Sequence, residues 1–294
     1  MTLTQCNDHH AQTERLVLRN RRLKAASASS FRLSKFYLDC ISDTGDALIV
    51  YAARAEWRGL KFSYVSLLES APGLPTRMSS SLRAYAAPAW RDGSLCFDFA
   101  PLKISARWQT ENAPTQYPLL KTSAGEVIWT CLAPRARATI NHRGKRIEGS
   151  GYAEHLLLTI PPWQLPIKDL HWGRFHSATD SLVWIKWLGE QPLDLTLHNG
   201  VALDAPSEIS ADHVRVQPLT LTLSDTRELC VGRIATTALW PLRKIISAFP
   251  SSILNLHESK WISAGTLHHD AVSSGMPECG YALHEHVIFP ARTT

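Results

Sequence analysis

The chain has 294 residues, of which 45% are hydrophobic and 19% are charged, and its Gly (15) and Pro (17) counts are near average, which excludes collagen-like and disordered chains. The net charge is +5, and residues 1–35 carry all of it, so the remainder is neutral and gives no support for a nucleic-acid-binding domain. Apolar runs such as Ala47–Ala53 are far shorter than the roughly 20 residues of a membrane-spanning helix.

Residues 1–35 are predicted to form a flexible basic arm. No apolar segment typical of a secretory signal follows the first charges. The Arg- and Ser-rich composition of residues 15–35 also fits an organellar transit peptide, although Asp8 and Glu14 weaken that interpretation. We expect a cytoplasmic protein with no membrane span, in which the arm could make peripheral contact with a membrane.

Cysteine and tryptophan usage adds two expectations. The six cysteines contain no Cys-x-x-Cys pair and are interpreted as reduced core residues of an intracellular protein rather than as disulfides. Ten tryptophans are many for this length, which indicates either a large apolar cavity or a large core.

Strand patterns dominate from residue 36 onward. Ala47–Trp57 and Leu60–Leu68 flank Arg58-Gly59 and predict a hairpin. Val214–Leu223 is interrupted by Pro218, which suggests an edge strand or a bulge. Helical spacing after Pro241 predicts a short helix over 241–249. Further strands are expected at Phe36–Ile41, Leu102–Trp108, Val127–Leu132, Leu182–Leu188, Leu193–Leu197 and Glu258–Leu267. Many short strands with few helices favour an all-β barrel or sandwich.

A weak internal repeat lies about 130 residues apart in the chain. Gly149–His155 and Gly280–His286 each contain Gly-Tyr-Ala followed by Glu-His. In an extended strand, Tyr152 and Glu154 share one face. Two copies of this pattern fit two similar barrels.

Glu154 is the carboxylate that best fits a catalytic role. It follows a Gly-rich turn and precedes an apolar run, and a carboxylic acid in an apolar pocket can stay protonated near neutral pH and protonate an alkene. Tyr152 would hold the acid or a water molecule, and His155 is included in the candidate catalytic group. The alternative is a structural Glu154, exposed or paired with Arg174.

Trp172 and Arg174 are candidate residues for a cavity mouth, because an aromatic face stabilises a developing cation. The alternative is a core Trp with Arg stacked on it. Trp163, Tyr281 and Glu285 complete the candidate substrate-binding set.

His284 and His286 share a strand face near His268-His269-Asp270, but no third ligand stands at a diagnostic spacing, so no metal is expected. No nucleotide-binding motif or G-x-S-x-G elbow is present, and we expect no cofactor.

Several of these segments resemble the lipocalin-like superfamily of carotenoid 1,2-hydratases (hydroxyneurosporene synthases) and AttH-like proteins. The matching segments are Phe36–Gly45, Gly151–His155, Leu170–Phe175, Glu258–Trp261 and Gly280–His286. The resemblance implies two tandem calycin-type β-barrels, at 36–168 and 169–294, with a break near Pro161-Pro162 and Pro166. The alternative is one large β-sandwich.

The resemblance also implies a hydrophobic ligand site in a superfamily that includes alkene hydratases and fungal pericyclases. Where the hydratases carry a Tyr-x-Asp arrangement, this chain has Tyr152-x-Glu154, and His171-Trp172 are adjacent rather than alternate. We therefore expect a cofactor-independent enzyme that hydrates, cyclises or isomerises a hydrophobic isoprenoid-like molecule. The alternative is a non-catalytic carrier of such a molecule, with no nucleic-acid partner in either case.

Overall fold

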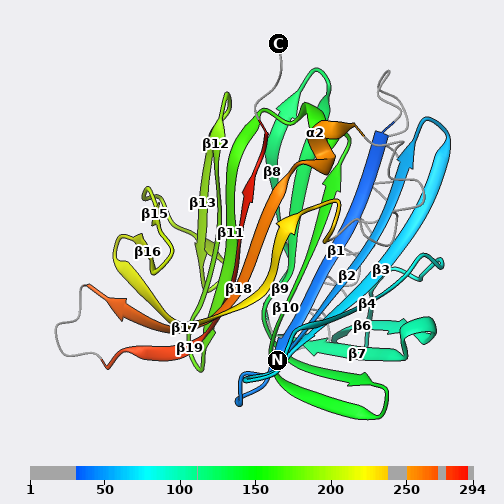
Figure 1. Cartoon of the computed structure of the whole chain (residues 1–294). Coiled ribbons are helices and arrows are strands. Elements are labelled where there is room, and N and C mark those ends of the chain that lie inside the picture. The colour runs from blue at the N-terminus through cyan, green and yellow to red at the C-terminus, as the bar shows by residue number, and fades with distance from the viewer. Residues whose placement is uncertain (1–30, 111, 238–249, 271–275, 291–294) are drawn as a thin grey trace, which may run out of the picture.

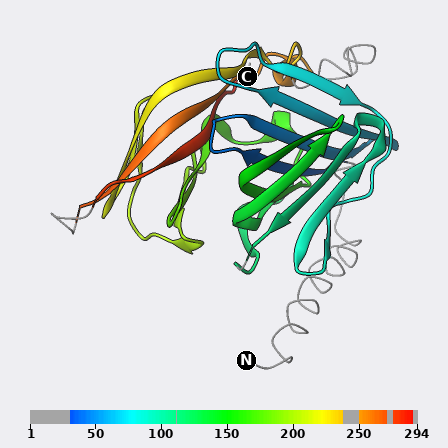
Figure 2. The same ribbon diagram turned by 90° about the horizontal axis from the view of Figure 1, so that it is seen from below.

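Strands make up most of the chain. The computed structural model describes residues 31–110, 112–237, 250–270 and 276–290. These residues form two antiparallel sheets, each curled into an open barrel, and the two sheets lie side by side (Figures 1 and 2). The prediction of an all-β fold built from two tandem antiparallel barrels is confirmed.

The first sheet has the spatial order β4-β3-β2-β1-β10-β9-β7-β6-β5, and β8 pairs with β9 beside this path. Its strands are β1 (Phe31–Ile41), β2 (Ala47–Trp57), β3 (Leu60–Ser70), β4 (Arg77–Ser81), β5 (Ala89–Arg91), β6 (Ser94–Phe99), β7 (Ile104–Gln109), β8 (Thr115–Thr122), β9 (Gly125–His142) and β10 (Lys145–Leu158). A single 3-10 turn, η1 (Ala100–Leu102), connects β6 to β7.

The second sheet repeats this plan with the order β14-β13-β12-β11-β19-β18-β17-β16-β15. Its strands are β11 (Ile167–Ser177), β12 (Ser181–Gly189), β13 (Leu193–His198), β14 (Val201–Ala202), β15 (Glu208–Ile209), β16 (His213–Val216), β17 (Leu219–Arg233), β18 (His257–His269) and β19 (Glu278–Ile288). The short helices η2 (Pro162–Gln164) and α2 (Ser251–Leu254) lie outside the sheets. In both sheets the first strand pairs with the second and with the last, so β1 and β10 correspond to β11 and β19.

Turn residues explain the hairpins that the sequence predicts. Arg58 and Gly59 both have positive φ, 50° and 80°, the conformation that a two-residue hairpin turn needs. Strands β2 and β3 pair along their full length around this turn, which confirms the predicted hairpin. Arg143 and Gly144 close the longer β9–β10 hairpin in the same way.

Some expected boundaries differ from the structure. Residues 31–35, expected in the basic arm, already belong to β1, because all of them pair with β2 and residues 33–35 also pair with β10. Pro218 lies neither in an edge strand nor in a bulge, but in the tight turn where Val216 of β16 pairs with Leu219 of β17. The second sheet begins at Ile167, whereas the second barrel was expected to begin at residue 169. The division of the chain into two domains stays a prediction. The helix predicted at 241–249 lies outside the described residues.

Side-chain alternation along the strands separates the core into layers. We call the inside of each curled sheet its curl. One face of β1 and β10 lies in the first curl, where the core contains Trp108 and Phe97. The corresponding face of β11 and β19 lies in the second curl, where the core contains Phe175 and Trp184. The opposite faces of these four strands meet each other in a third cluster, which we call the inter-sheet core. It contains Tyr37, Ile49, Trp129, Tyr152, Trp172, Ile185, Ile262 and Leu283, among others.

Two glycines mark the internal repeat in the structure. A Cβ added at Gly149 would lie 1.9 Å from the carbonyl oxygen of Ile41, and one added at Gly280 would lie 1.9 Å from that of His176. Counting along β10 and β19 from these two glycines brings Glu154 and Glu285 to equivalent positions. The sequence repeat therefore corresponds to a structural repeat.

Two further features bear on the class of protein. Among the described residues, no helix has the length and apolarity needed to cross a bilayer. Within the same residues, Cys40, Cys96, Cys131, Cys230 and Cys279 are free thiols.

Candidate functional site

A buried carboxylate at the inter-sheet core collects hydrogen bonds from three strands. Glu154 of β10 accepts bonds at Oε2 from Trp129 Nε1 of β9 at 2.6 Å, from the Tyr152 hydroxyl at 2.7 Å and from Trp172 Nε1 of β11 at 3.1 Å. Glu154 is 7% exposed. The structure thus brings Tyr152, Glu154 and Trp172 together, with Trp129 as a further donor, and their roles stay predictions.

Strand register explains how this cluster assembles. Tyr152 and Glu154 lie two residues apart and point to the same face of β10. Glu154 is opposite Cys131 on β9, so Trp129, two residues earlier, faces the same side. Register shifts opposite Ala153 place extra residues in β9, which bulges at this point. Trp172 comes from the second sheet and contacts the carboxylate across the inter-sheet core.

Burial controls the electrostatics of the cluster. Removal of Glu154 from water raises the pKa of its carboxyl, and the bonds from Trp129, Tyr152 and Trp172 and the charge of Lys35 act against this rise. Burial also raises the pKa of the Tyr152 hydroxyl well above its usual range. The hydrogen-bond donors on Glu154 are therefore neutral groups, and the desolvated carboxyl favours its protonated form more than an exposed Glu does.

Aromatic rings surround the carboxyl on the inter-sheet side. The Tyr37 ring lies 4.7 Å from the Trp172 ring and 5.3 Å from the Tyr51 ring, both edge to face. Lys260 of β18 places its ammonium 4.7 Å from the centre of the Tyr51 ring, and Lys35 approaches the same ring at 5.1 Å. Tyr51 and Lys35 are only partly buried, so this end of the cluster is nearest to solvent.

Glu285 occupies the position in the second sheet that Glu154 occupies in the first, but its partner differs. Its carboxylate lies 3.1 Å from Lys260 Nζ, and both side chains are largely buried. Lys260 lowers the pKa of Glu285, against the effect of burial. The repeat therefore carries one carboxyl held by neutral donors and one carboxylate held by a cation.

The other predicted site residues lie elsewhere. Arg174 does not pair with Glu154; it forms a fully buried ion pair with Asp39. His155 is directed to the opposite face of β10, where its Nε2 lies 2.8 Å from Ser34 Oγ and its ring stacks on Phe36. It is therefore separate from the Glu154 cluster, and burial lowers its pKa to about 4.

Trp163 and Tyr281 are also outside the cluster. Trp163 contacts Phe31 and Trp57 edge to face, with ring centres 5.6 and 5.1 Å apart. Tyr281 contributes its backbone carbonyl to Arg174, and its ring packs beside Gly45. Both residues pack against the inter-sheet core, and their role in substrate binding stays a prediction.

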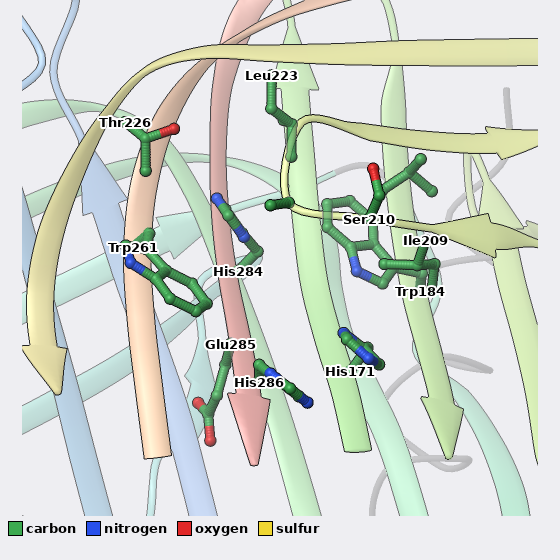
Figure 3. A pocket seen from close by; sticks show the side chains of 12 residues that line it. His171, Trp184, Ile209, Ser210, Leu223, Thr226, Trp261, His284, Glu285 and His286 are labelled. Atoms are coloured by element: carbon green, nitrogen blue, oxygen red, sulfur yellow. The ribbon is translucent and has the colours of Figure 1, made fainter. Parts of the chain in front are cut away.

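A cavity of about 480 Å³ lies inside the second curl (Figure 3). Trp184, Val214, Leu223 and Trp261 form apolar parts of its wall, and His171, His284 and His286 line the same space. Glu154 and Trp172 are not among its lining residues, so the expected placement of Trp172 at a cavity mouth does not apply to this cavity.

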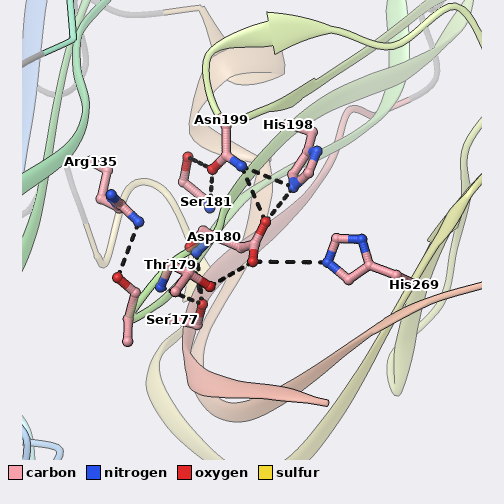
Figure 4. A network of polar contacts seen from close by, with 9 residues as sticks. Arg135, Ser177, Thr179, Asp180, Ser181, His198, Asn199 and His269 are labelled. Carbon is pink, nitrogen blue, oxygen red and sulfur yellow. Dashed lines mark hydrogen bonds and ion pairs between the residues drawn. The ribbon is translucent and has the colours of Figure 1, made fainter. Parts of the chain in front are cut away.

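The histidines separate into different groups. His284 lies 2.9 Å from Ser263 Oγ, whereas His286 stacks on His171 and approaches Asp169. His269 instead lies near Asp180 and His198 in a second polar network (Figure 4).

Sequence reasoning missed several residues of the inter-sheet core. Trp129 lies within a predicted strand, but its direction depends on the pairing of β9 with β10. Tyr37 and Tyr51 lie in predicted strands of the first sheet, and Lys260 lies in the second. The Glu-Ser-Lys-Trp segment at 258–261 is among those that resemble the superfamily, and this resemblance is the available signal for Lys260.

Comparison with known proteins identifies the fold. No family model and no curated protein matches this sequence. Three solved structures share its architecture. Kievitone hydratase from Nectria haematococca has 10% sequence identity and a TM-score of 0.51, with 90% of each chain covered. CghA has 12% identity and a TM-score of 0.52, with 91% of each chain covered.

The third is an AttH-like protein from Nitrosomonas europaea, with 11% identity and a TM-score of 0.50 over 90% of this chain and 95% of that one. Because the sequence identities are so low, these similarities establish the fold alone. The chain has the tandem lipocalin-like fold of these proteins, as its resemblance to the hydratase and AttH-like superfamily implies.

Proposed function

We propose that this chain is a cofactor-independent enzyme that protonates an alkene of a hydrophobic, isoprenoid-like molecule and so hydrates, cyclises or isomerises it. The observation that supports this most is the buried Glu154 carboxyl, which has a raised pKa and is held by two indoles and a phenol. The fold shared with a protein named kievitone hydratase is consistent with a hydration reaction.

Hydrogen bonding indicates which oxygen of Glu154 acts. Trp129, Tyr152 and Trp172 all donate to Oε2, which leaves Oε1 outside this set of bonds. In the protonated acid, Oε1 carries the hydrogen. This hydrogen is transferred to an alkene carbon as the π electrons form the new C–H bond. The carboxylate that remains is stabilised by the three donors already in place.

The cation forms at the more substituted carbon and needs negative potential near it. Ring faces supply such potential, and Tyr37, Tyr152 and Trp172 stand within 6.0 Å of one another, centre to centre. In hydration, a water oxygen attacks the cation and its proton returns to Glu154. In cyclisation an internal nucleophile takes the place of water, and in isomerisation a neighbouring C–H bond gives up its proton to the carboxylate.

The test uses the full chain and heavy water. A panel of isoprenoid alcohols and polyenes is incubated with the protein in D2O, and mass spectrometry detects carbon-bound deuterium and the addition of water. Glu154→Gln keeps the shape of the side chain but removes the acid, and we expect a roughly 10²–10⁴-fold loss of turnover. Glu148→Gln, an exposed position on the same strand, is the matched control and should retain activity. Turnover of Glu154→Gln within a few fold of the parent would exclude Glu154 as the acid.

A carrier of a hydrophobic molecule is the second candidate, and the cavity of about 480 Å³ favours it. Its walls include Trp184, Val214, Leu223 and Trp261, which suit an apolar ligand. The same panel distinguishes the two functions. Displacement of a fluorescent apolar probe without deuterium incorporation in any bound compound would favour the carrier.

A further inference from the structure

Two strands of the second sheet bring a carboxylate and two imidazoles together. His171 of β11 is directly opposite His286 of β19, and Asp169 lies two residues before His171 on the same strand. His171 Nε2 is 2.9 Å from Asp169 Oδ1, and His286 Nε2 is 2.9 Å from Asp169 Oδ2. The rings are nearly parallel, at 7°, with centres 4.3 Å apart. Both Nε2 atoms therefore face one carboxylate.

The equivalent place in the first sheet lacks this combination. There His155 is opposite Phe36, and Ser34 stands two residues before Phe36. The register thus matches Ser34, Phe36 and His155 with Asp169, His171 and His286. A hydroxyl and a phenyl ring in the first sheet are replaced by a carboxylate and a second imidazole in the second. The combination of one carboxylate and two imidazoles is specific to the second barrel and is not a general consequence of the fold.

The three groups have the chemistry of a zinc site. Imidazole nitrogen and carboxylate oxygen are common zinc ligands, and two His plus one carboxylate occur where a fourth position stays open for water or substrate. All three ligand atoms lie within 4.8 Å of one another. Zinc–ligand bonds of about 2.0–2.2 Å require the side chains to turn so that the two Nε2 atoms and a carboxylate oxygen converge on one point.

We propose that Asp169, His171 and His286 bind a divalent transition metal ion, zinc in the first place, at the wall of the second-barrel cavity. His171 and His286 both line that cavity, together with Trp184 and Trp261 (Figure 3). A metal ion held by these three groups would have a coordination position left for a molecule bound in that cavity. The ligand class is therefore a hydrophobic molecule with an oxygen donor, such as a carbonyl or carboxylate. This departs from the expectation of no metal drawn from sequence spacing.

A second group of similar composition is a poorer site. Asp180 already accepts hydrogen bonds from Thr179 Oγ1 at 2.8 Å and from Asn199 Nδ2 at 3.1 Å, and lies 2.6 Å from His198 Nε2 (Figure 4). His269 stands further off, at 3.8 Å from Asp180. A metal ion here would displace neutral donors from the carboxylate, so this group serves as an internal comparison.

The site is independent of Glu154. His171 and His286 line the cavity of the second curl, whereas Trp172, next to His171 on β11, faces the inter-sheet core and donates to Glu154. Loss of metal binding therefore leaves the proposed proton donor in place, and the two proposals can fail separately.

The experiment measures metal binding by the full chain after treatment with a chelator. Calorimetric titration with Zn²⁺ should give one site per chain. Titration with Co²⁺ should give visible absorption without the near-ultraviolet charge-transfer bands that thiolate ligands produce, which separates this site from the cysteines. His286→Gln and Asp169→Asn should each weaken binding by about 100-fold or more, because even outer-shell changes cost 10–100-fold. Circular dichroism checks that each variant folds. Because the two substitutions lie on different strands, one variant still tests the site if the other misfolds.

His284→Gln is the matched control, because His284 lines the same cavity on the same strand but bonds to Ser263. It should bind zinc as the parent does, and so should His269→Gln. The proposal is overturned if the parent binds no stoichiometric metal, if the cobalt spectrum shows thiolate bands, or if His286→Gln and Asp169→Asn bind zinc as the parent does; loss of binding in His269→Gln would instead place the metal at Asp180.

Discussion

Arg174 of β11 and Asp39 of β1 join the two sheets through a two-point ion pair in which neither side chain is exposed to solvent. Arg174 Nη2 lies 2.5 Å from Asp39 Oδ1, and Nε lies 3.1 Å from Oδ2. Arg174 also donates to the carbonyl of Tyr281. A buried pair of this kind holds the two sheets in one alignment, because either charge alone would be costly in the core.

Removal of the Arg174 charge should therefore destabilise the protein strongly. We expect Arg174→Met to lower the free energy of unfolding by about 3–5 kcal/mol, since the Asp39 carboxylate is left buried without a partner. The double variant Asp39→Leu with Arg174→Met should recover part of this loss. Urea unfolding gives the free energy of unfolding of the parent, of Arg174→Met and of the double variant. Arg91→Met, which removes an exposed pair with Asp98, should change little. An equally small effect at Arg174 would contradict a stabilising role for the buried pair.

The glycines of the repeat should behave alike. Alanine at Gly149 or Gly280 would place a methyl group against a backbone carbonyl of the neighbouring strand. Each substitution should lower the free energy of unfolding by about 1–3 kcal/mol, the usual range for overpacking. The melting temperature should fall by similar amounts in the two variants. A large effect at one position and none at the other would show that the two glycines are not structural equivalents.

His155 should make stability sensitive to acid. Burial lowers its pKa to about 4, whereas an unfolded chain titrates near 6.5. Between these values the unfolded state binds more protons, so stability falls as the pH drops through this range. At pH 4.5 the loss from this residue should be about 2–3 kcal/mol. Urea unfolding of the parent and of His155→Gln at pH 7 and pH 4.5 isolates the contribution of His155 to this pH dependence, because the other buried histidines remain in both proteins. An unchanged pH dependence in the variant would contradict the assignment.

Glu154 should have the opposite pH dependence. Its folded pKa is raised above the ordinary 4.5, so its favourable contribution is complete below that value and is lost as the pH rises through the folded pKa. The free energy of unfolding of the parent, minus that of Glu154→Gln, should therefore fall as the pH increases above 4.5. A difference that grows with pH would show instead that the folded protein favours the carboxylate.

The sequence predicted local structure better than the meeting of distant residues. Hairpins such as β2–β3 follow from alternation and from a Gly turn, and the shared face of Tyr152 and Glu154 follows from strand geometry alone. The partner of Arg174 could not be predicted, because Asp39 is 135 residues away and meets it only when the two sheets pack. Trp129 was missed for a similar reason, since its direction depends on register shifts between β9 and β10.

The metal-ligand set shows the same limit. His284 and His286 are candidate ligands in the sequence because they are two residues apart, yet the partner of His286 is His171 on the neighbouring strand. Spacing along the chain detects ligands on one strand, but ligands that face each other across a pair depend on register. Asp169, which completes the group, gave no signal in the sequence.

The proposed function depends on Glu154 being a buried carboxylic acid able to donate a proton, and infrared difference spectroscopy tests this property directly. The spectrum of the parent minus that of Glu154→Gln isolates the C=O stretch of this one protonated carboxyl, and ¹³C labelling of glutamate confirms its origin. We predict a protonated-acid band that disappears with a midpoint above pH 4.5, as the raised pKa requires. A midpoint at or below 4.5, or only carboxylate bands throughout, would contradict the account.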